Sequence, residues 1–66
     1  MAKETSLDVI RKILDYAEEG MSPTKIQIEL KVKYGIILNQ SSIIELLTSQ
    51  PKIFFQIEGK WKVRIN

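Results

Sequence analysis

Apolar and polar residues alternate along the last third of the chain, in two runs that lie on either side of Gly59. β-Branched and aromatic residues are frequent in both runs. Alternation of this kind around a short loop that contains glycine is typical of a β-hairpin. The pattern therefore predicts a hairpin over residues 52–65. Because a two-stranded hairpin is only marginally stable alone, its apolar face must pack on the preceding part of the chain.

The register of this hairpin depends on the length of its loop. A two-residue Glu58-Gly59 loop would place Trp61 on the same face as Phe54 and would put lysines beside the other apolar residues. A three-residue loop separates an apolar face from a basic one: Ile53, Phe55, Trp61 and Val63 against Lys52, Phe54, Gln56, Lys60, Lys62 and Arg64. We therefore expect the three-residue loop, with Trp61 buried. Phe54 would then lie on the basic face, where it either stacks on a base or, as we favour, packs beneath the end of the preceding helix.

Upstream of the hairpin, apolar residues recur at three- and four-residue spacing, which is typical of amphipathic helices. The spacing predicts helices over residues 6–19, 23–34 and 41–50. Ser6 is a candidate N-cap of the first helix. Asn39, Ser41 or Ser42 would cap the third helix, and Pro51 would end it before the hairpin.

Residues 26–34, within the second helix, also alternate between apolar and polar as a strand would. Ser22 followed by Pro23 is a helix start signal, and Gly35 is a stop signal, so we expect a helix here. After Gly35, residues 36–38 are apolar and too few for a helix. They predict a short strand that pairs with a free edge of the hairpin.

The composition limits the class of protein. A chain of 66 residues is enough for one domain, which we expect to span residues 1–66 with residues 1–5 disordered. Cysteine and histidine are absent, so disulfides, thiolate metal sites and a histidine base are excluded. We expect no enzymatic activity, metal, cofactor or small-molecule substrate. No apolar run reaches the ~20 residues of a membrane span, and we expect a cytoplasmic protein (nuclear if eukaryotic) with no membrane partner.

The net charge of +2 is unevenly distributed along the chain. Residues 1–20 hold three cations and five anions, whereas residues 51–66 hold four cations and one anion. The predicted hairpin is thus the positive end, which points weakly to a polyanionic partner. Alternatively, its lysines solvate an edge hairpin and discourage aggregation.

The order helix, helix, short strand, helix, hairpin resembles that of a winged helix-turn-helix domain. The resemblance is carried by Gly20-Met21-Ser22-Pro23, by Tyr34-Gly35-Ile36-Ile37-Leu38, by the helix Ser41-Ser42-Ile43-Ile44-Glu45-Leu46-Leu47 and by the run from Pro51 to Arg64 with its Gly-x-Trp. That last run is similar to the closing hairpin of HARE-type winged helices, as at the N-terminus of the bacterial RNA polymerase delta subunit, and more loosely to LOTUS domains. The resemblance covers nearly the whole chain. It implies a small α+β fold with three helices, a short strand and a C-terminal hairpin, the wing.

In winged helices that bind DNA, the third helix usually enters the major groove and the wing contacts the backbone or minor groove. The resemblance therefore implies a nucleic-acid partner, expected to be double-stranded DNA, and a role in the control of transcription or replication. The implied contact residues are Lys52, Lys60, Lys62 and Arg64 of the wing and Gln40, Ser41, Ser42 and Thr48 of the third helix. Since that helix has no lysine or arginine and carries Glu45, we expect low or modest sequence specificity.

An alternative use of the same fold is protein–protein interaction, since some HARE-type and LOTUS domains dock on proteins or RNA. The second helix has a second apolar stripe, Ile28 and Val32, that would face partly outward. Together with Ile36 or Ile37, it would form the contact with a protein partner. A pair of partly exposed apolar residues such as Ile28 and Val32 more often packs against a neighbouring segment of the same chain. The sequence is also compatible with a homodimer that binds two half-sites.

Overall fold

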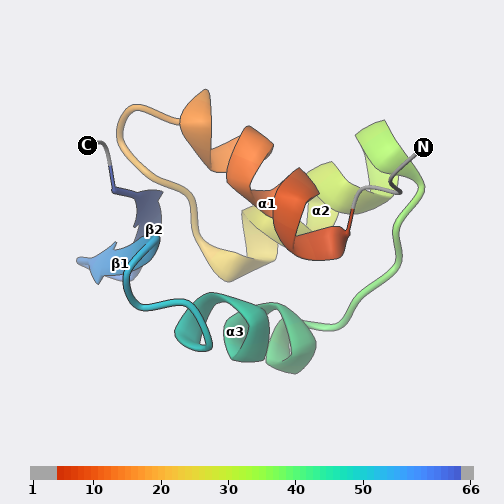
Figure 1. The fold of residues 1–66 in the computed structure, drawn as a ribbon. Helices are drawn as coiled ribbons and strands as arrows, with labels where there is room; N and C mark the ends of the chain where they lie inside the picture. The colour runs from red at the N-terminus through yellow and green to blue at the C-terminus, as the bar shows by residue number, and fades with distance from the viewer. Residues whose placement is uncertain (1–4, 65–66) are drawn as a thin grey trace.

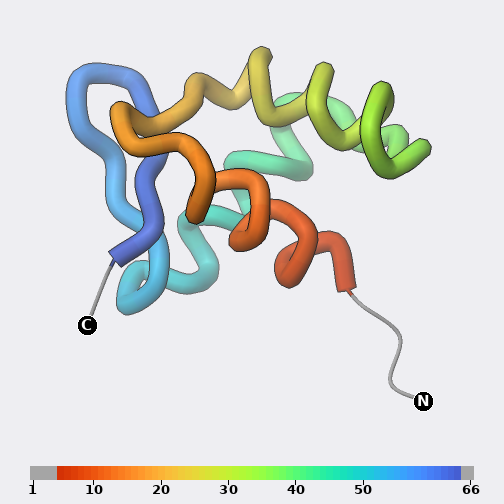
Figure 2. The backbone as a smooth tube through the Cα atoms, turned by 90° about the horizontal axis from the view of Figure 1, so that it is seen from above, coloured from red at the N-terminus to blue at the C-terminus, as the bar shows by residue number. Residues whose placement is uncertain are grey.

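The computed structural model describes residues 5–64, which form three helices and a C-terminal hairpin (Figure 1). In chain order the elements are α1 (Ser6–Asp15), α2 (Pro23–Tyr34), α3 (Gln40–Thr48), β1 (Phe54–Ile57) and β2 (Lys60–Val63). The two strands pair antiparallel. The predicted α+β class with three helices and a hairpin is confirmed. Figures 1 and 2 both place the hairpin at one end of the domain and the C-terminal end of α2 at the other.

Local capping explains where α1 begins. The Thr5 hydroxyl accepts a hydrogen bond from the Asp8 N–H, and the Asp8 carboxylate accepts one from the Thr5 N–H, both at 3.2 Å. This capping box makes Thr5 the N-cap in place of the predicted Ser6. Thr5 thus belongs to the fold, although we predicted disorder over residues 1–5. Residues 1–4 of that segment lie outside the described residues. The helix ends at Asp15, earlier than predicted.

The other two helices follow their cap signals closely. Ser22 caps α2 ahead of Pro23, and Gly35 closes it with a left-handed φ of 67°, so the helical interpretation of residues 26–34 is confirmed. Asn39 caps α3 by accepting a hydrogen bond from the Ser42 N–H at 2.8 Å. The helix stops at Thr48, shortly before Pro51.

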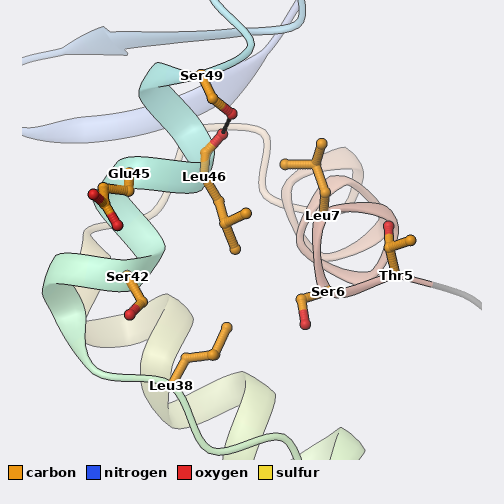
Figure 3. Close-up of a pocket in the computed structure, with 8 residues that line it drawn as sticks. All are labelled: Thr5, Ser6, Leu7, Leu38, Ser42, Glu45, Leu46 and Ser49. Atoms are coloured by element: carbon orange, nitrogen blue, oxygen red, sulfur yellow. Dashed lines mark hydrogen bonds between the residues drawn. The ribbon is translucent and has the colours of Figure 1, made fainter.

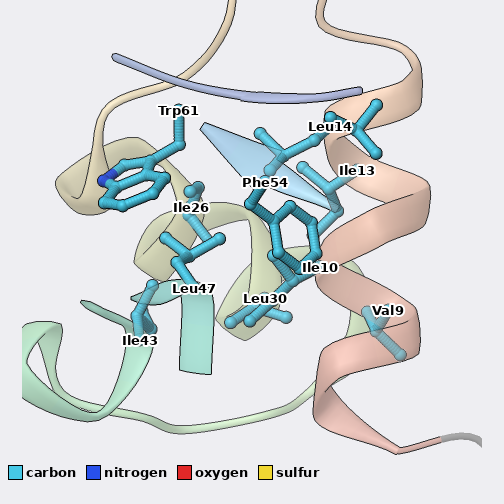
Figure 4. Close-up of a cluster of buried hydrophobic side chains, with 11 residues drawn as sticks. Val9, Ile10, Ile13, Leu14, Ile26, Leu30, Ile43, Leu47, Phe54 and Trp61 are labelled. Carbon is cyan, nitrogen blue, oxygen red and sulfur yellow. The ribbon is translucent and has the colours of Figure 1, made fainter. Parts of the chain in front are cut away.

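One apolar core holds the helices and the hairpin together (Figure 4). Its members in the described chain are Val9, Ile10, Ile13, Leu14, Ile26, Leu30, Ile43, Leu47, Phe54, Trp61 and Val63. Trp61 is buried as predicted. Phe54 is only 2% exposed, so it packs in the core and is not available to a base. The hairpin contributes three of the core side chains and is therefore a structural part of the domain as well as a surface.

The register of the hairpin corrects our prediction. Phe54 pairs with Val63, Gln56 with Trp61 and Ile57 with Lys60, so the loop has two residues, Glu58 and Gly59. Both loop residues have positive φ angles, 52° and 79°, which is the type I′ turn that suits the twist of a hairpin. The predicted three-residue loop, which paired Phe55 with Trp61, is wrong.

The observed register places some apolar residues beside charged ones, which is the arrangement we rejected. Phe55, Ile57, Lys60, Lys62 and Arg64 share the side of the hairpin that faces away from the core, here called the hairpin outer face. Its apolar members are partly covered, since the Arg64 guanidinium lies 4.9 Å from the centre of the Phe55 ring. This covering lowers the cost of leaving Phe55 outside the core.

The third strand that we predicted over residues 36–38 is also wrong, because these residues have no regular structure. The free edge of β2 pairs instead with Met21, just before α2. The Met21 N–H donates to the Trp61 carbonyl at 3.0 Å, and the Trp61 N–H donates to the Met21 carbonyl at 2.8 Å. Ile36 is used differently: its N–H donates to the Leu30 carbonyl at 3.0 Å beyond the end of α2. This bond closes the helix, and the chain then reverses into α3, which leads back to the hairpin (Figure 1).

The type I′ turn leads to a stability prediction. Glu58 occupies a left-handed conformation that favours asparagine or glycine. Glu58→Asn should therefore raise the free energy of unfolding by about 0.5–1 kcal/mol, as measured by urea denaturation. Glu58→Gln is the matched control, since it removes the charge and keeps the strain. An equal gain from both variants would assign the effect to charge and contradict the turn assignment.

Candidate nucleic-acid interface

The hairpin outer face gathers three of the four predicted cationic contact residues. Lys60, Lys62 and Arg64 lie at alternate positions of β2 and its continuation, and so project from the same side of the strand. Phe55 and Ile57 lie opposite them on β1. The fourth predicted cation, Lys52, is exposed in the turn that leads into β1. The structure therefore brings the basic residues together around two partly exposed apolar side chains.

Arg64 is held in place at the base of this face. Its Nε donates a hydrogen bond to the Pro51 carbonyl at 3.2 Å, while its guanidinium stacks over Phe55. The Arg64 N–H also donates to the Ile53 carbonyl at 2.6 Å, which extends the pairing of the strands. Ordering a cation before binding lowers the side-chain entropy lost when it meets a phosphate. The remaining guanidinium N–H groups are left for an external acceptor.

Lys62 differs from the other cations in its surroundings. It is half-buried, and it lines a hollow of about 290 Å³ together with Asp15, the last residue of α1, and Glu18 in the turn that follows. Its stem also lies next to Gly20. Nearby carboxylates reduce the positive potential that a phosphate would meet at Lys62. We therefore expect Lys60 and Arg64 to contribute more to anion binding than Lys62.

The predicted contact residues of α3 do not form one polar surface. The Gln40 amide donates to the Thr24 hydroxyl at 3.0 Å, and the Thr48 hydroxyl donates to the Ile44 carbonyl of its own helix at 2.9 Å. Ser42 is half-buried, whereas Ser41 is exposed. In Figure 1, the Gln40 end of α3 lies away from the hairpin and the Thr48 end lies near it. Only the C-terminal end of α3 therefore adjoins the basic hairpin.

The residues of the alternative, protein-binding hypothesis differ in their exposure to solvent. Ile28 and Val32 are 51% and 75% exposed on α2, as predicted. Of the two loop residues considered, Ile36 is half-buried and packs against the core, while Ile37 is 81% exposed. The exposed set is therefore Ile28, Val32 and Ile37, here called the α2 outer face. The pattern of apolar residues in the loop gave no signal for which of its two isoleucines would face solvent.

A hollow of about 690 Å³ lies between the start of α1 and α3 (Figure 3). It is lined by Thr5, Ser6, Leu7, Leu38, Ser42, Glu45, Leu46 and Ser49. In Figure 3 Leu38 and Leu46 project into it from one side and Leu7 approaches from the other. Among the described residues, Glu45 is the one charged residue of its lining. The described lining therefore offers no cation to a nucleic acid.

Comparisons with protein-family models, with curated proteins and with solved structures find no match to this chain. Within residues 5–64, no helix is long and apolar enough to cross a membrane.

Proposed function

We propose that this chain is a non-enzymatic winged-helix domain that binds nucleic acid, in the first place double-stranded DNA, through its hairpin. The observation that carries the proposal is the alignment of Lys60, Lys62 and Arg64 on one side of β2, with Lys52 at its base. Lysine and arginine side chains in such an arrangement neutralise successive phosphates. Glu58, at the turn, is the hairpin's one acidic residue.

The connectivity of the domain supports the winged-helix part of this proposal. Met21, between α1 and α2, pairs with β2, and α3 is followed directly by the hairpin. The predicted order was helix, helix, short strand, helix and hairpin. The three helices and the hairpin follow one another in that order, but the edge segment lies at Met21, between α1 and α2, and not at residues 36–38. This resemblance concerns the fold. The binding function is argued from the hairpin residues.

The exposed side of α3 argues for low sequence specificity. Specific readout in the major groove relies mainly on arginine, lysine, asparagine or glutamine that reach base edges. Gln40 is tied to Thr24, and the exposed side of α3 also carries Ile44 and Glu45. Phosphate contacts position a protein on DNA without reading its sequence. We therefore propose a general DNA-binding role in transcription or replication control.

Binding should depend on individual hairpin cations in a measurable order. Lys60→Gln and Arg64→Gln should each weaken binding to all duplex sequences about equally. Each should also reduce the salt slope, which is the magnitude of the slope of the logarithm of the binding constant against the logarithm of the salt concentration, by about 0.9. Lys62→Gln should have a smaller effect, because Asp15 and Glu18 lie beside it. Fluorescence anisotropy with a labelled random duplex, titrated at several salt concentrations, measures these changes.

The matched control is Lys31→Gln, which removes an exposed lysine of α2 and should leave the salt slope unchanged. Ser41→Ala should also have little effect on random DNA, because a neutral hydroxyl releases no counterion. A single-stranded probe of the same length distinguishes duplex binding from strand binding. Absence of salt-dependent affinity near ~50 mM salt, where phosphate contacts are strong, would contradict the proposed function.

A further inference from the structure

Helix α2 is apolar on two opposite sides. Ile26 and Leu30 face the core and are fully buried, whereas Ile28 and Val32 project from the opposite side. Ile37, from the loop after α2, is exposed as well. Each of these three aliphatic side chains is at least half exposed within residues 5–64, so the α2 outer face is a candidate binding surface.

The α2 outer face also contains a hollow. Gln27, Ile28, Lys31, Ile37 and Leu38 line a hollow of about 280 Å³ beside α2. The Gln27 amide donates a hydrogen bond to the Leu38 carbonyl at 3.0 Å and so fixes the loop against the helix. The hollow is therefore preformed, which lowers the cost of binding an aliphatic side chain.

The charges around this surface are of one sign. Lys25 and Lys31 are exposed on α2, and neither forms an ion pair with a residue in the described part of the chain. The one carboxylate of α2, Glu29, lies on the side that faces α1, where it binds Lys33 at 3.2 Å. The α2 outer face thus combines an aliphatic centre with a cationic rim that has no anion of its own.

We infer that the α2 outer face binds a segment of a partner protein that carries aliphatic side chains flanked by carboxylates. The aliphatic residues of such a segment would cover Ile28, Val32 and Ile37, and its carboxylates would meet Lys25 and Lys31. A second copy of this chain fits less well, because a two-fold contact would bring the same cationic rims together. A nucleic acid would not cover an aliphatic centre.

This surface lies on α2 and the following loop, away from the hairpin (Figures 1 and 2). The α2 outer face contains none of the hairpin cations, so peptide binding there and DNA binding by the hairpin can be tested independently. With both surfaces occupied, the domain would link an acidic protein segment to DNA.

The test is a titration of the ¹⁵N-labelled chain with two synthetic amphipathic peptides, followed by amide chemical shifts. One peptide has leucine at i, i+3, i+4 and i+7 and glutamate at the other positions, and the second has lysine in place of glutamate. The acidic peptide should shift the amides of Ile28, Lys31, Val32 and Ile37. Val32→Ser should raise its Kd by about tenfold or more. Lys25→Glu combined with Lys31→Glu should reverse the preference in favour of the basic peptide.

Tyr16→Ser is the matched control, because Tyr16 is the most exposed large apolar side chain of the described residues at 89% and lies outside the α2 outer face. It should leave the Kd unchanged. Equal binding of both peptides, or no binding of either at ~1 mM, would overturn the inference. Shifts of the same amides on raising the protein concentration alone, with a dimer in sedimentation, would identify a second copy as the occupant and would also overturn it.

Discussion

Phe54→Ala is expected to lower the free energy of unfolding by about 3–5 kcal/mol. The Phe54 ring is 2% exposed and lies in the core with side chains of the helices (Figure 4), so its removal leaves a cavity that surrounding residues fill only in part. A domain of this size is stable by only about 5–15 kcal/mol, and small domains lie near the lower end. Thermal or urea denaturation followed by far-ultraviolet circular dichroism should show a large loss of stability or an unfolded variant.

Phe55→Ala is the control, since it truncates the neighbouring residue of the same type. Phe55 is half-buried on the hairpin outer face, and its main described partner is the Arg64 guanidinium. Its loss should cost about 1 kcal/mol, as expected for a partly exposed cation–π contact. The reverse order, with Phe55→Ala the more damaging change, would mean that the hairpin has the three-residue loop and the opposite register.

The helices could be predicted because their ends are determined locally. Ser22, Pro23 and Gly35 act through hydrogen bonds and backbone angles that depend only on nearby residues. Those signals therefore outweighed the strand-like alternation of residues 26–34. The cap of α1 is Thr5 in place of Ser6, a difference of one residue, which is within the usual uncertainty of helix ends, whereas the helix ends at Asp15, well before the predicted residue 19.

The hairpin register could not be predicted from the separation of apolar and polar residues. That criterion treats Phe55 and Ile57 as residues that must be buried, yet the guanidinium of Arg64 covers Phe55 and Ile57 lies at the hairpin tip, half exposed. The Glu58-Gly59 pair was the better signal, because a glycine at the second loop position suits a two-residue turn. A local turn preference here overcame the pattern of the whole hairpin.

The prediction that the cations of β2 share one face was right although the predicted register was wrong, and the reason is geometrical. Lys60, Lys62 and Arg64 alternate along one strand, so they share a face whichever register the hairpin adopts. What the register changes is their surroundings: Phe55 and Ile57 lie on this face, and Phe54 does not. The proximity of Asp15 and Glu18 to Lys62 depends on tertiary packing, which no local pattern contains.

Gly20→Ala is expected to lower the free energy of unfolding by about 2–5 kcal/mol, from a strained backbone and a steric clash together. Gly20 has a φ of 88° and lies beside β2, where an added Cβ would be 2.8 Å from the Lys62 Cγ and 3.0 Å from the Trp61 carbonyl oxygen. That oxygen accepts a hydrogen bond from the Met21 N–H, so it cannot move without weakening the pairing that joins the hairpin to the chain before α2.

Gly35→Ala is the matched control, because Gly35 also has a positive φ, 67°, but no atom lies within 4 Å of the added Cβ. This substitution should cost only about 1–2 kcal/mol. Urea denaturation of both variants measures the difference, and amide hydrogen exchange should show that Gly20→Ala selectively exposes the Met21 and Trp61 N–H groups. Equal losses in the two variants would mean that backbone conformation alone accounts for Gly20, and that the close approach of Gly20 to β2 contributes nothing to stability.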